Sequence, residues 1–126
     1  MRKLMILATV VVACLLAGCV GEVETYTDSG RAINTSINQE FVIALGSNPT
    51  TGYSWQASYD QSRLELIGGE STYQARKDEQ GTVGAGGIEY FRFKSLKAGE
   101  AELTMVYKRP WEEEILERKV FTVNVG

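Results

Sequence analysis

Histidine is absent from this chain of 126 residues. Its absence excludes the Ser-His-Asp and Cys-His nucleophile systems, and every zinc site that depends on histidine. A glycine-rich phosphate loop between a strand and a helix is also missing. Enzymes can work with paired carboxylates or a lysine, so these absences argue strongly against catalysis but do not disprove it. We expect a protein that is not an enzyme and that uses no cofactor and no metal.

Cysteine and clustered basic residues are equally scarce. The only two cysteines, Cys14 and Cys19, lie near the N-terminus, so the rest of the chain has neither a disulfide nor a free thiol and depends on core packing. Thirteen basic residues oppose 16 acidic ones, and loss of Arg2 and Lys3 with a signal peptide would leave 11. Without a basic cluster, the sequence lacks the footprint of a nucleic-acid-binding protein.

The one long apolar run, residues 4–16, follows Arg2 and Lys3. It is too short to cross a bilayer as a stable helix, but its length suits the core of a secretory signal. The run ends in Leu16-Ala17-Gly18-Cys19, which resembles the lipobox of bacterial lipoproteins. We therefore predict a signal peptide over residues 1–18 and a lipid on Cys19. The alternative is a plain signal peptide with an unmodified Cys19.

Cleavage before Cys19 would leave enough chain for one domain and not for two. Residues 19–30 are polar and acidic, and we expect them to form a flexible tether. Residues 31–126 then form the folded domain. We expect a monomer outside the cytoplasm, on the periplasmic side or at the cell surface, that contacts the membrane only through its lipid.

The remaining pattern is that of β-structure. Apolar residues alternate with polar ones in seven short segments: 41–45, 53–59, 64–66, 72–75, 90–94, 103–107 and 121–125. A polar loop is expected over residues 76–87. Residues 112–119 favour a helix locally but lack an apolar stripe, so we interpret them as a loop that leads into an extended strand. This pattern predicts an all-β sandwich.

The most informative segment is Asn48-Pro49-Thr50-Thr51-Gly52-Tyr53-Ser54-Trp55. Pro49 fixes its own φ and restricts Asn48 to extended conformations, so the segment begins as a stiff turn. Gly52 can adopt a backbone angle that Thr51 would resist, which reverses the chain before Tyr53. The two threonines would offer hydroxyl and methyl groups at a rigid tip. The segment alone would also fit an ordinary tight loop.

Two other segments belong with it: Gly84-Ala85-Gly86-Gly87 and Arg109-Pro110-Trp111-Glu112. We expect residues 64–66 and 72–75 to form two separate strands that alternate in direction like the others. Antiparallel strands alternate in direction, so we expect all three segments at one end of the sandwich. Functional loops gathered at one end of a rigid sandwich are also the arrangement of antibody domains.

These motifs, together with the Ala98-Gly99 turn and Tyr107, resemble the chagasin-like inhibitors of papain-type cysteine peptidases. The resemblance extends from about Ile33 to the C-terminus. It implies an immunoglobulin-like antiparallel β-sandwich of about seven or eight strands. It also implies a reversible inhibitor that wedges its first loop into the peptidase cleft, flanked by the other two. The residues that would bind the peptidase are Asn48, Pro49, Thr50, Thr51, Gly52, Tyr53, Gly84, Ala85, Gly86, Gly87, Arg109, Pro110 and Trp111.

Each assignment has a simpler counterpart. Trp55 fits the core better than a contact surface, whereas Trp111 follows Pro110 in a loop and should be exposed. Arg109 could pair with Glu112, Glu113 or Glu114 as a solvated ion pair, and the glycines could form a flexible turn.

Two other functions stay open at this point. One is a lipid-anchored binding module for a glycan or cell-surface ligand, with Trp111, Tyr53 and Tyr90 as its platform. The other is an enzyme that uses Glu112 and Glu114. This second alternative is disfavoured because the carboxylates of a glycosidase must flank a bond from opposite sides, and these two lie close together in one loop.

Overall fold

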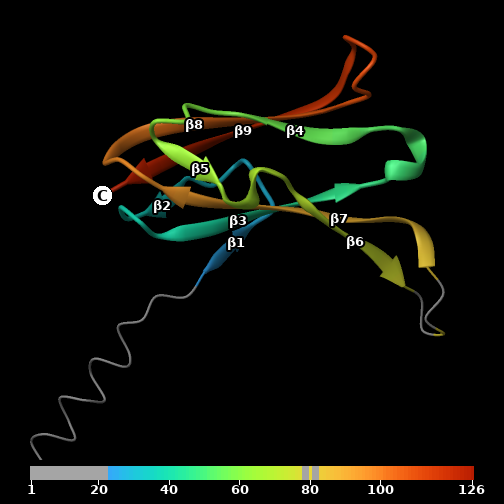
Figure 1. Cartoon of the computed structure of the whole chain (residues 1–126), viewed down its shortest axis with the longest axis horizontal. Coiled ribbons are helices and arrows are strands. Elements are labelled where there is room, and N and C mark those ends of the chain that lie inside the picture. Colours follow the sequence, from blue (N-terminus) through green and yellow to red (C-terminus); the bar gives the residue numbers. More distant parts are fainter. Residues whose placement is uncertain (1–22, 78–79, 81–82) are drawn as a thin grey trace, which may run out of the picture.

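The computed structural model describes residues 23–77, 80 and 83–126. In these residues nine strands form two sheets (Figure 1). The strands are β1 (Glu24–Tyr26), β2 (Ile33–Thr35), β3 (Glu40–Ser47), β4 (Ser54–Ser58), β5 (Leu64–Leu66), β6 (Thr72–Lys77), β7 (Val83–Ser95), β8 (Gly99–Lys108) and β9 (Ile115–Val125). Two short 3-10 helices, η1 (Pro49–Thr51) and η2 (Ile67–Gly69), precede β4 and β6.

The predicted all-β sandwich is confirmed. No helix in the described part of the chain is long and apolar enough to cross a membrane. The predicted signal peptide (residues 1–18) and lipidated Cys19 lie outside the described residues. The expected loop over residues 112–119 extends only to Glu114, because β9 begins at Ile115.

The first sheet has the order β1-β3-β7-β5, and β6 also pairs with β7. The second sheet has the order β2-β9-β8-β4. Most neighbours are antiparallel, but β1 runs parallel to β3 and β2 runs parallel to β9. These two strands have three residues each, too few to show a period of two in the sequence.

Strand β1 lies inside the segment that was expected to be a flexible tether. Glu24 and Tyr26 pair with Phe41 and Ile43 of β3. The Tyr26 ring also packs edge-on against Phe41, with centroids 6.4 Å apart. Burial raises the pKa of Tyr26, and its hydrogen bond to the Glu24 carboxylate raises that pKa further. The tether prediction is therefore wrong for residues 24–26, which belong to the sheet.

The core lies between the two sheets and contains the inward residues of every long strand. Phe41 and Phe93 stack at its centre, with ring centroids 5.6 Å apart. Burial of each such side chain stabilises the fold by roughly 1.5–3 kcal/mol. The buried apolar residues of the core are Ile33, Phe41, Ile43, Leu45, Trp55, Leu64, Phe91, Phe93, Ala101, Leu103, Met105, Phe121, Val123 and Val125.

The strand directions differ from those expected. Both β5 and β6 are antiparallel to β7, so they run in the same direction instead of alternating. Helix η2 separates them, and Gly68 and Gly69 lie there with φ values of 80° and 75°. Only glycine adopts such angles readily. Together, β5 and β6 therefore form a single interrupted edge beside β7.

The three segments singled out in the sequence nevertheless share one end of the sandwich. Ser47, the last residue of β3, pairs with Gly87 near the start of β7. Ser54, the first residue of β4, pairs with Lys108 at the end of β8. The β3–β4 connection and the start of β7 lie on the right in Figure 1, and the β8–β9 connection rises at the upper right; we call this side the loop end. The predicted grouping is confirmed, although the strand count behind it was wrong.

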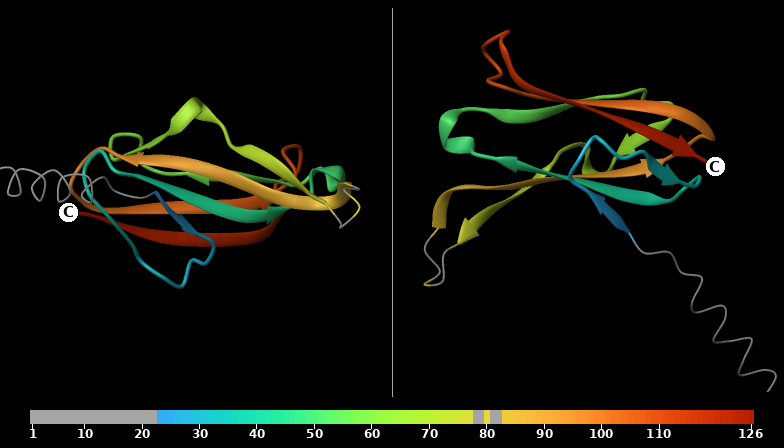
Figure 2. Two further views of the ribbon diagram at one scale, coloured as in Figure 1. Left: turned by 90° about the horizontal axis from the view of Figure 1, so that it is seen from below. Right: turned by 180° about the vertical axis from the view of Figure 1, so that it is seen from behind.

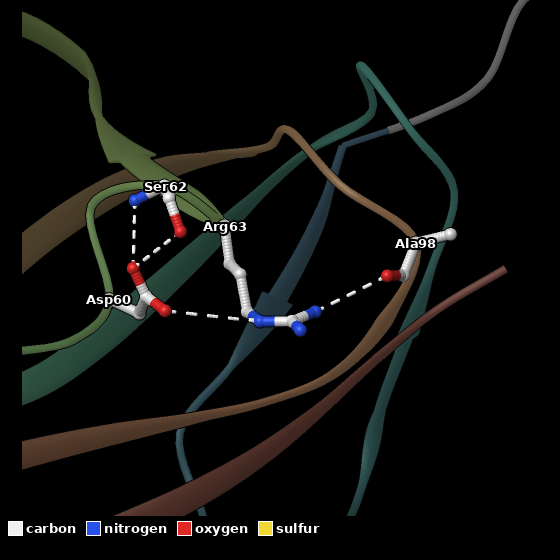
Figure 3. Close-up of polar contacts among 4 residues, drawn as sticks. All are labelled: Asp60, Ser62, Arg63 and Ala98. Carbon is white, nitrogen blue, oxygen red and sulfur yellow. Dashed lines mark hydrogen bonds and ion pairs between the residues drawn. The ribbon is translucent and has the colours of Figure 1, made fainter.

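The opposite side, which we call the far end, is held together by Arg63 (Figure 3). Its Nη1 donates to the Ala98 carbonyl at 3.2 Å, and its Nε lies 3.9 Å from Asp60 Oδ2. This side chain links the β4–β5 connection to the β7–β8 connection. Hydrogen bonds from the Ser62 hydroxyl and then from its N–H lower the pKa of Asp60, and the Arg63 charge lowers it further.

Candidate functional site

The loop between β3 and β4, residues 48–53, is a prefolded turn that we call the threonine loop. Its centre is η1, and the Asn48 side chain caps this helix by accepting hydrogen bonds from Thr50 N and Thr50 Oγ1. Gly52 closes the turn with a φ of 84°. Figure 2 shows this tight turn from two further sides. The stiff entry at Asn48 and the special backbone angle at Gly52 are both confirmed.

The threonine hydroxyls serve this turn. Thr50 Oγ1 donates to Asn48 Oδ1 at 2.5 Å, and Thr51 Oγ1 donates to the Asn48 carbonyl at 2.6 Å. Pro49, Thr50 and Thr51 are exposed at the tip. The prediction that both hydroxyls are offered outward is therefore wrong in one respect. The hydrogen of each hydroxyl is already donated to Asn48, and these local side-chain bonds fix the turn.

The connection between β8 and β9, residues 109–114, is bonded to the threonine loop, and we call it the tryptophan loop. Arg109 Nε donates to the Thr51 carbonyl at 2.9 Å, and Arg109 Nη1 donates to Glu112 Oε1 at 3.1 Å. The guanidinium carbon lies 4.5 Å from the centroid of the Tyr53 ring. The suggested ion pair with Glu112 is present, but the same arginine also joins two loops.

The two tryptophans have opposite roles. Trp111 is 71% exposed, whereas Trp55 is only 5% exposed and donates its indole N–H to the Gly46 carbonyl. A Cβ placed on Gly52 would lie 2.6 Å from Trp111 Cη2, so the exposed ring rests against this glycine. Both expectations, a core Trp55 and an exposed Trp111, are confirmed.

Tyr107 supports the threonine loop from below. Its Oη accepts a hydrogen bond from Asn48 N at 2.9 Å. Its ring packs on those of Tyr53 and Trp55, with centroid distances of 5.4 and 4.9 Å. The alternation in the sequence predicted that Tyr107 faces inward. It gave no sign of the hydrogen bond, because the partner is 59 residues away.

Residues 84–87, which we call the glycine segment, lie in β7 and not in a loop. Gly87 pairs with Ala75 of β6 and with Ser47 of β3. A Cβ on Gly87 would approach Ala75 Cα to 2.8 Å and Tyr73 Oη to 2.7 Å, so this glycine permits close strand packing. The expected loop over residues 76–87 is therefore wrong at both ends. Arg76 and Lys77 belong to β6, and from Val83 onward the chain is in β7, because pairing with β6 overrides the low strand propensity of glycine.

The glycine segment also projects beyond its neighbour. The pairing of β3 with β7 ends at Ser47 and Gly87, whereas β7 begins at Val83. Residues 83–86 of β7 thus continue past the last β3 pair, beside the threonine loop.

A buried carboxylate beneath this end was not anticipated from the sequence. Glu89 is 7% exposed and faces the second sheet across the core. It accepts a hydrogen bond from Trp55 N at 3.4 Å and one from Ser71 Oγ at 2.6 Å. Strand β4 is an edge strand, so its Trp55 N–H is satisfied by a side chain. Glu89 therefore joins the two sheets just below the threonine loop.

Comparison with known proteins identifies this arrangement. Residues 34–125 match the model of the chagasin family of peptidase inhibitors, family I42. The chain belongs to this family. A chagasin-family protein is an inhibitor, so the prediction that this chain is not an enzyme is confirmed, and the role suggested for Glu112 and Glu114 is rejected.

Individual relatives agree with the chagasin-family assignment. Amoebiasin-2 of Entamoeba histolytica is 32% identical over 89 residues, which cover 71% of each chain. Chagasin of Trypanosoma cruzi is 28% identical over 103 residues, 79% of this chain and 91% of chagasin. The crystal structure of a cysteine protease inhibitor from Entamoeba histolytica has a TM-score of 0.68 at 28% identity and covers 84% of this chain and 99% of its own.

The glycan-binding alternative gains no support from these relatives. Its proposed platform also lacks a free Tyr53, because this ring packs against the Arg109 guanidinium and against Tyr107. What the loop end offers instead is a rigid, exposed turn with a tryptophan beside it.

Proposed function

We propose that this chagasin-family chain inhibits papain-like cysteine peptidases reversibly by inserting the threonine loop into the active-site cleft. The observation that supports this most is the prefolded state of the loop. Its 3-10 turn, its Asn48 cap and its bond to Arg109 are already formed in the free chain. Binding then orders few groups, and such preorganisation is a main source of affinity.

The segments on either side of the threonine loop are suited to contact the two walls of a peptidase cleft. On one flank, the backbone of residues 83–86 extends beyond the β3 pairing and can approach another backbone closely. On the other flank, the exposed Trp111 offers a large rigid apolar surface. Tryptophan is enriched among the residues that dominate binding energy at interfaces.

A titration tests the proposal. A soluble fragment, residues 21–126, is added to papain and to a cathepsin L-type enzyme with a fluorogenic peptide substrate. We expect saturable, reversible inhibition with the inhibitor left intact. Absence of inhibition at micromolar concentration, by protein shown to be folded, would refute the proposed function.

We also propose that Cys19 carries a lipid and holds the domain at the outer side of a cell membrane. Support comes from the lipobox-like segment and from the direction of β1. Because β1 is parallel to β3, Glu24 lies beside Phe41, at the end of β3 away from the threonine loop. Five residues from Cys19 to Glu24 reach at most about 17 Å. Such an anchor would point the loop end away from the membrane.

Incorporation of labelled palmitate in a bacterial host tests this anchor. We expect Cys19→Ser to abolish labelling and membrane association. The matched control Cys14→Ser, a change within the predicted signal, should keep both. Equal labelling of the two variants would contradict the assignment of Cys19.

A further inference from the structure

The peptide bond between Thr51 and Gly52 raises the question of why a peptidase would not cut it. This bond lies at the exposed tip of the threonine loop, which the proposed function places near a catalytic cysteine. Cysteine peptidases attack a carbonyl carbon with a thiolate while hydrogen-bond donors of the enzyme receive the carbonyl oxygen. Cleavage therefore requires a carbonyl oxygen that can enter the enzyme's oxyanion hole.

Two carbonyl oxygens of the threonine loop have partners within the loop. The Asn48 carbonyl accepts from Thr51 N at 3.2 Å and from Thr51 Oγ1 at 2.6 Å. The Pro49 carbonyl accepts from Gly52 N at 3.0 Å. These bonds are internal to the loop and belong to η1.

The Thr51 carbonyl is held differently, by a residue 58 positions further along the chain. Arg109 Nε donates to it at 2.9 Å. The guanidinium is itself fixed by Glu112, through a bond of 3.1 Å, and by the Tyr53 ring. Only about one third of the Arg109 side chain is exposed (34%), so its charge is directed at the threonine loop. A hydrogen bond from a charged donor is stronger than one between neutral groups.

We propose that Arg109 is a positioning residue that protects the Thr51–Gly52 bond from hydrolysis by the inhibited peptidase. The inference rests on the proposed function and extends it, since it explains how a loop can occupy a catalytic cleft without becoming a substrate. The carbonyl oxygen has two lone pairs, so this bond does not saturate it, but it fixes the direction in which the oxygen points. While Arg109 holds the Thr51 oxygen toward the tryptophan loop, that oxygen can turn into an oxyanion hole only after the charged bond is broken.

Loss of the bond would permit ordinary hydrolysis. The peptidase thiolate would attack the Thr51 carbonyl carbon and form a thioester, and the Gly52 nitrogen would leave as an amine after taking a proton from the enzyme's general acid. One water molecule would then release Thr51 as a carboxylate and regenerate the thiol. The products are an inhibitor nicked after residue 51 and a free peptidase.

The test uses intact-mass spectrometry during prolonged incubation with active papain. We expect Arg109→Ala to be cut after Thr51 at least about tenfold faster than the unaltered chain, with inhibition that decays over time. Arg109→Lys, which keeps a charged donor, should be cut at an intermediate rate. Glu112→Gln, which leaves Arg109 in place but weakens its orientation, should show a smaller acceleration.

Arg63→Ala is the matched control. It removes an arginine that also bonds to a distant carbonyl and lies near a carboxylate three residues away, but at the far end. It should remain intact and inhibit normally. A purely structural role of Arg109 would change stability or affinity without producing this single cut.

The outcomes separate the two proposals. If the unaltered chain does not inhibit papain, the proposed function fails and this inference fails with it. If the unaltered chain inhibits but folded Arg109→Ala stays uncut, or is cut only elsewhere, the protective role is overturned and the inhibitor assignment stands. If Arg109→Ala proves unfolded in a thermal melt, Arg109→Met decides, because it keeps an apolar stem but has no donor for the Thr51 carbonyl: cleavage after Thr51 supports protection, and an intact chain overturns it.

Discussion

At each end of this sandwich an arginine side chain links two connections, but the linked connections have different roles. At the loop end, Arg109 bonds to the Thr51 carbonyl and to a carboxylate three residues away. At the far end, Arg63 bonds to the Ala98 carbonyl and lies near a carboxylate three residues away (Figure 3). Each arginine thus ties two connections that are distant in the sequence.

Each end also has a glycine with a positive φ beside its arginine. Gly52 has a φ of 84° and lies near the Arg109 side chain, and Gly99 has a φ of 121° and lies near the Arg63 side chain. The ends differ in what the arginine holds. Arg63 holds turns between strands, whereas Arg109 holds an exposed helical turn beside the exposed Trp111. The proposed binding loop is therefore built as firmly as an ordinary structural turn.

The largest effects are expected from a comparison of the exposed Trp111 with Trp55 in the core beneath the loop end. We expect Trp55→Ala to lower the free energy of unfolding by about 3–5 kcal/mol, because it empties a core position. Trp111→Ala should leave the unfolding midpoint unchanged but weaken inhibition by roughly 30-fold, or about 2 kcal/mol. Chemical denaturation and inhibition constants measure the two effects. A loss of stability in Trp111→Ala would contradict the proposed division between an exposed contact residue and a core residue.

Substitution of the glycine at each end, Gly52 and Gly99, tests the same comparison. Gly52→Ala introduces a strained backbone and a Cβ that would lie 2.6 Å from Trp111 Cη2. We expect the inhibition constant to rise about 100-fold, which corresponds to about 2.7 kcal/mol. Gly99→Ala introduces similar strain at the far end and should lower the melting temperature without changing inhibition. Equal effects of both variants on inhibition would break the comparison.

Tyr107→Phe probes the support with a smaller change. It removes the acceptor of the Asn48 N–H and keeps the ring that packs on Tyr53 and Trp55. The net loss should be about 1 kcal/mol, seen as a roughly fivefold weaker inhibition constant. Tyr26→Phe, which removes a tyrosine hydroxyl that bonds to Glu24 on β1, is the control and should leave the constant unchanged. An equally weak Tyr26→Phe would mean that the hydroxyl of Tyr107 has no special role.

The smallest effect is expected at the exposed carboxylate of the far end. The pKa of Asp60 is lowered in the folded chain, so its contribution to stability is present above the ordinary carboxyl pKa of about 3.9 and is lost as the pH falls through the lowered value. Asp60→Asn should therefore be slightly less stable near neutral pH, and this difference should vanish in acid. Denaturation midpoints across the pH range measure it. A constant difference down to the lowest pH would contradict the link to ionisation.

Much of the loop end was predictable because its signals are local. The Pro49 and Gly52 positions determined the turn through their backbone preferences, and the period of two placed Trp55 in the core. Trp111 was expected to be exposed because it follows Pro110 in a loop. The grouping of the three segments was also right. It was reached through alternating directions for β5 and β6, which in fact run the same way.

The features that were missed depend on partners far away in the sequence. The bond between Arg109 and the Thr51 carbonyl leaves no pattern, because any residue supplies a carbonyl. Glu89 looks like a surface residue of a strand until its two partners, Trp55 N and Ser71 Oγ, are in place. The glycine segment was misassigned because propensity favours a turn, whereas pairing with β6 makes it a strand.

The interrupted edge made by β5 and β6 has a consequence for how copies of this inhibitor coexist. A long free edge offers a row of unpaired backbone groups to which another chain can add a strand. Here η2 divides that edge, and the two glycines with positive φ turn the chain out of the extended form. A second molecule could therefore pair with only a few residues at a time. We expect the break to disfavour pairing of a second copy along this edge, even when many copies are crowded together.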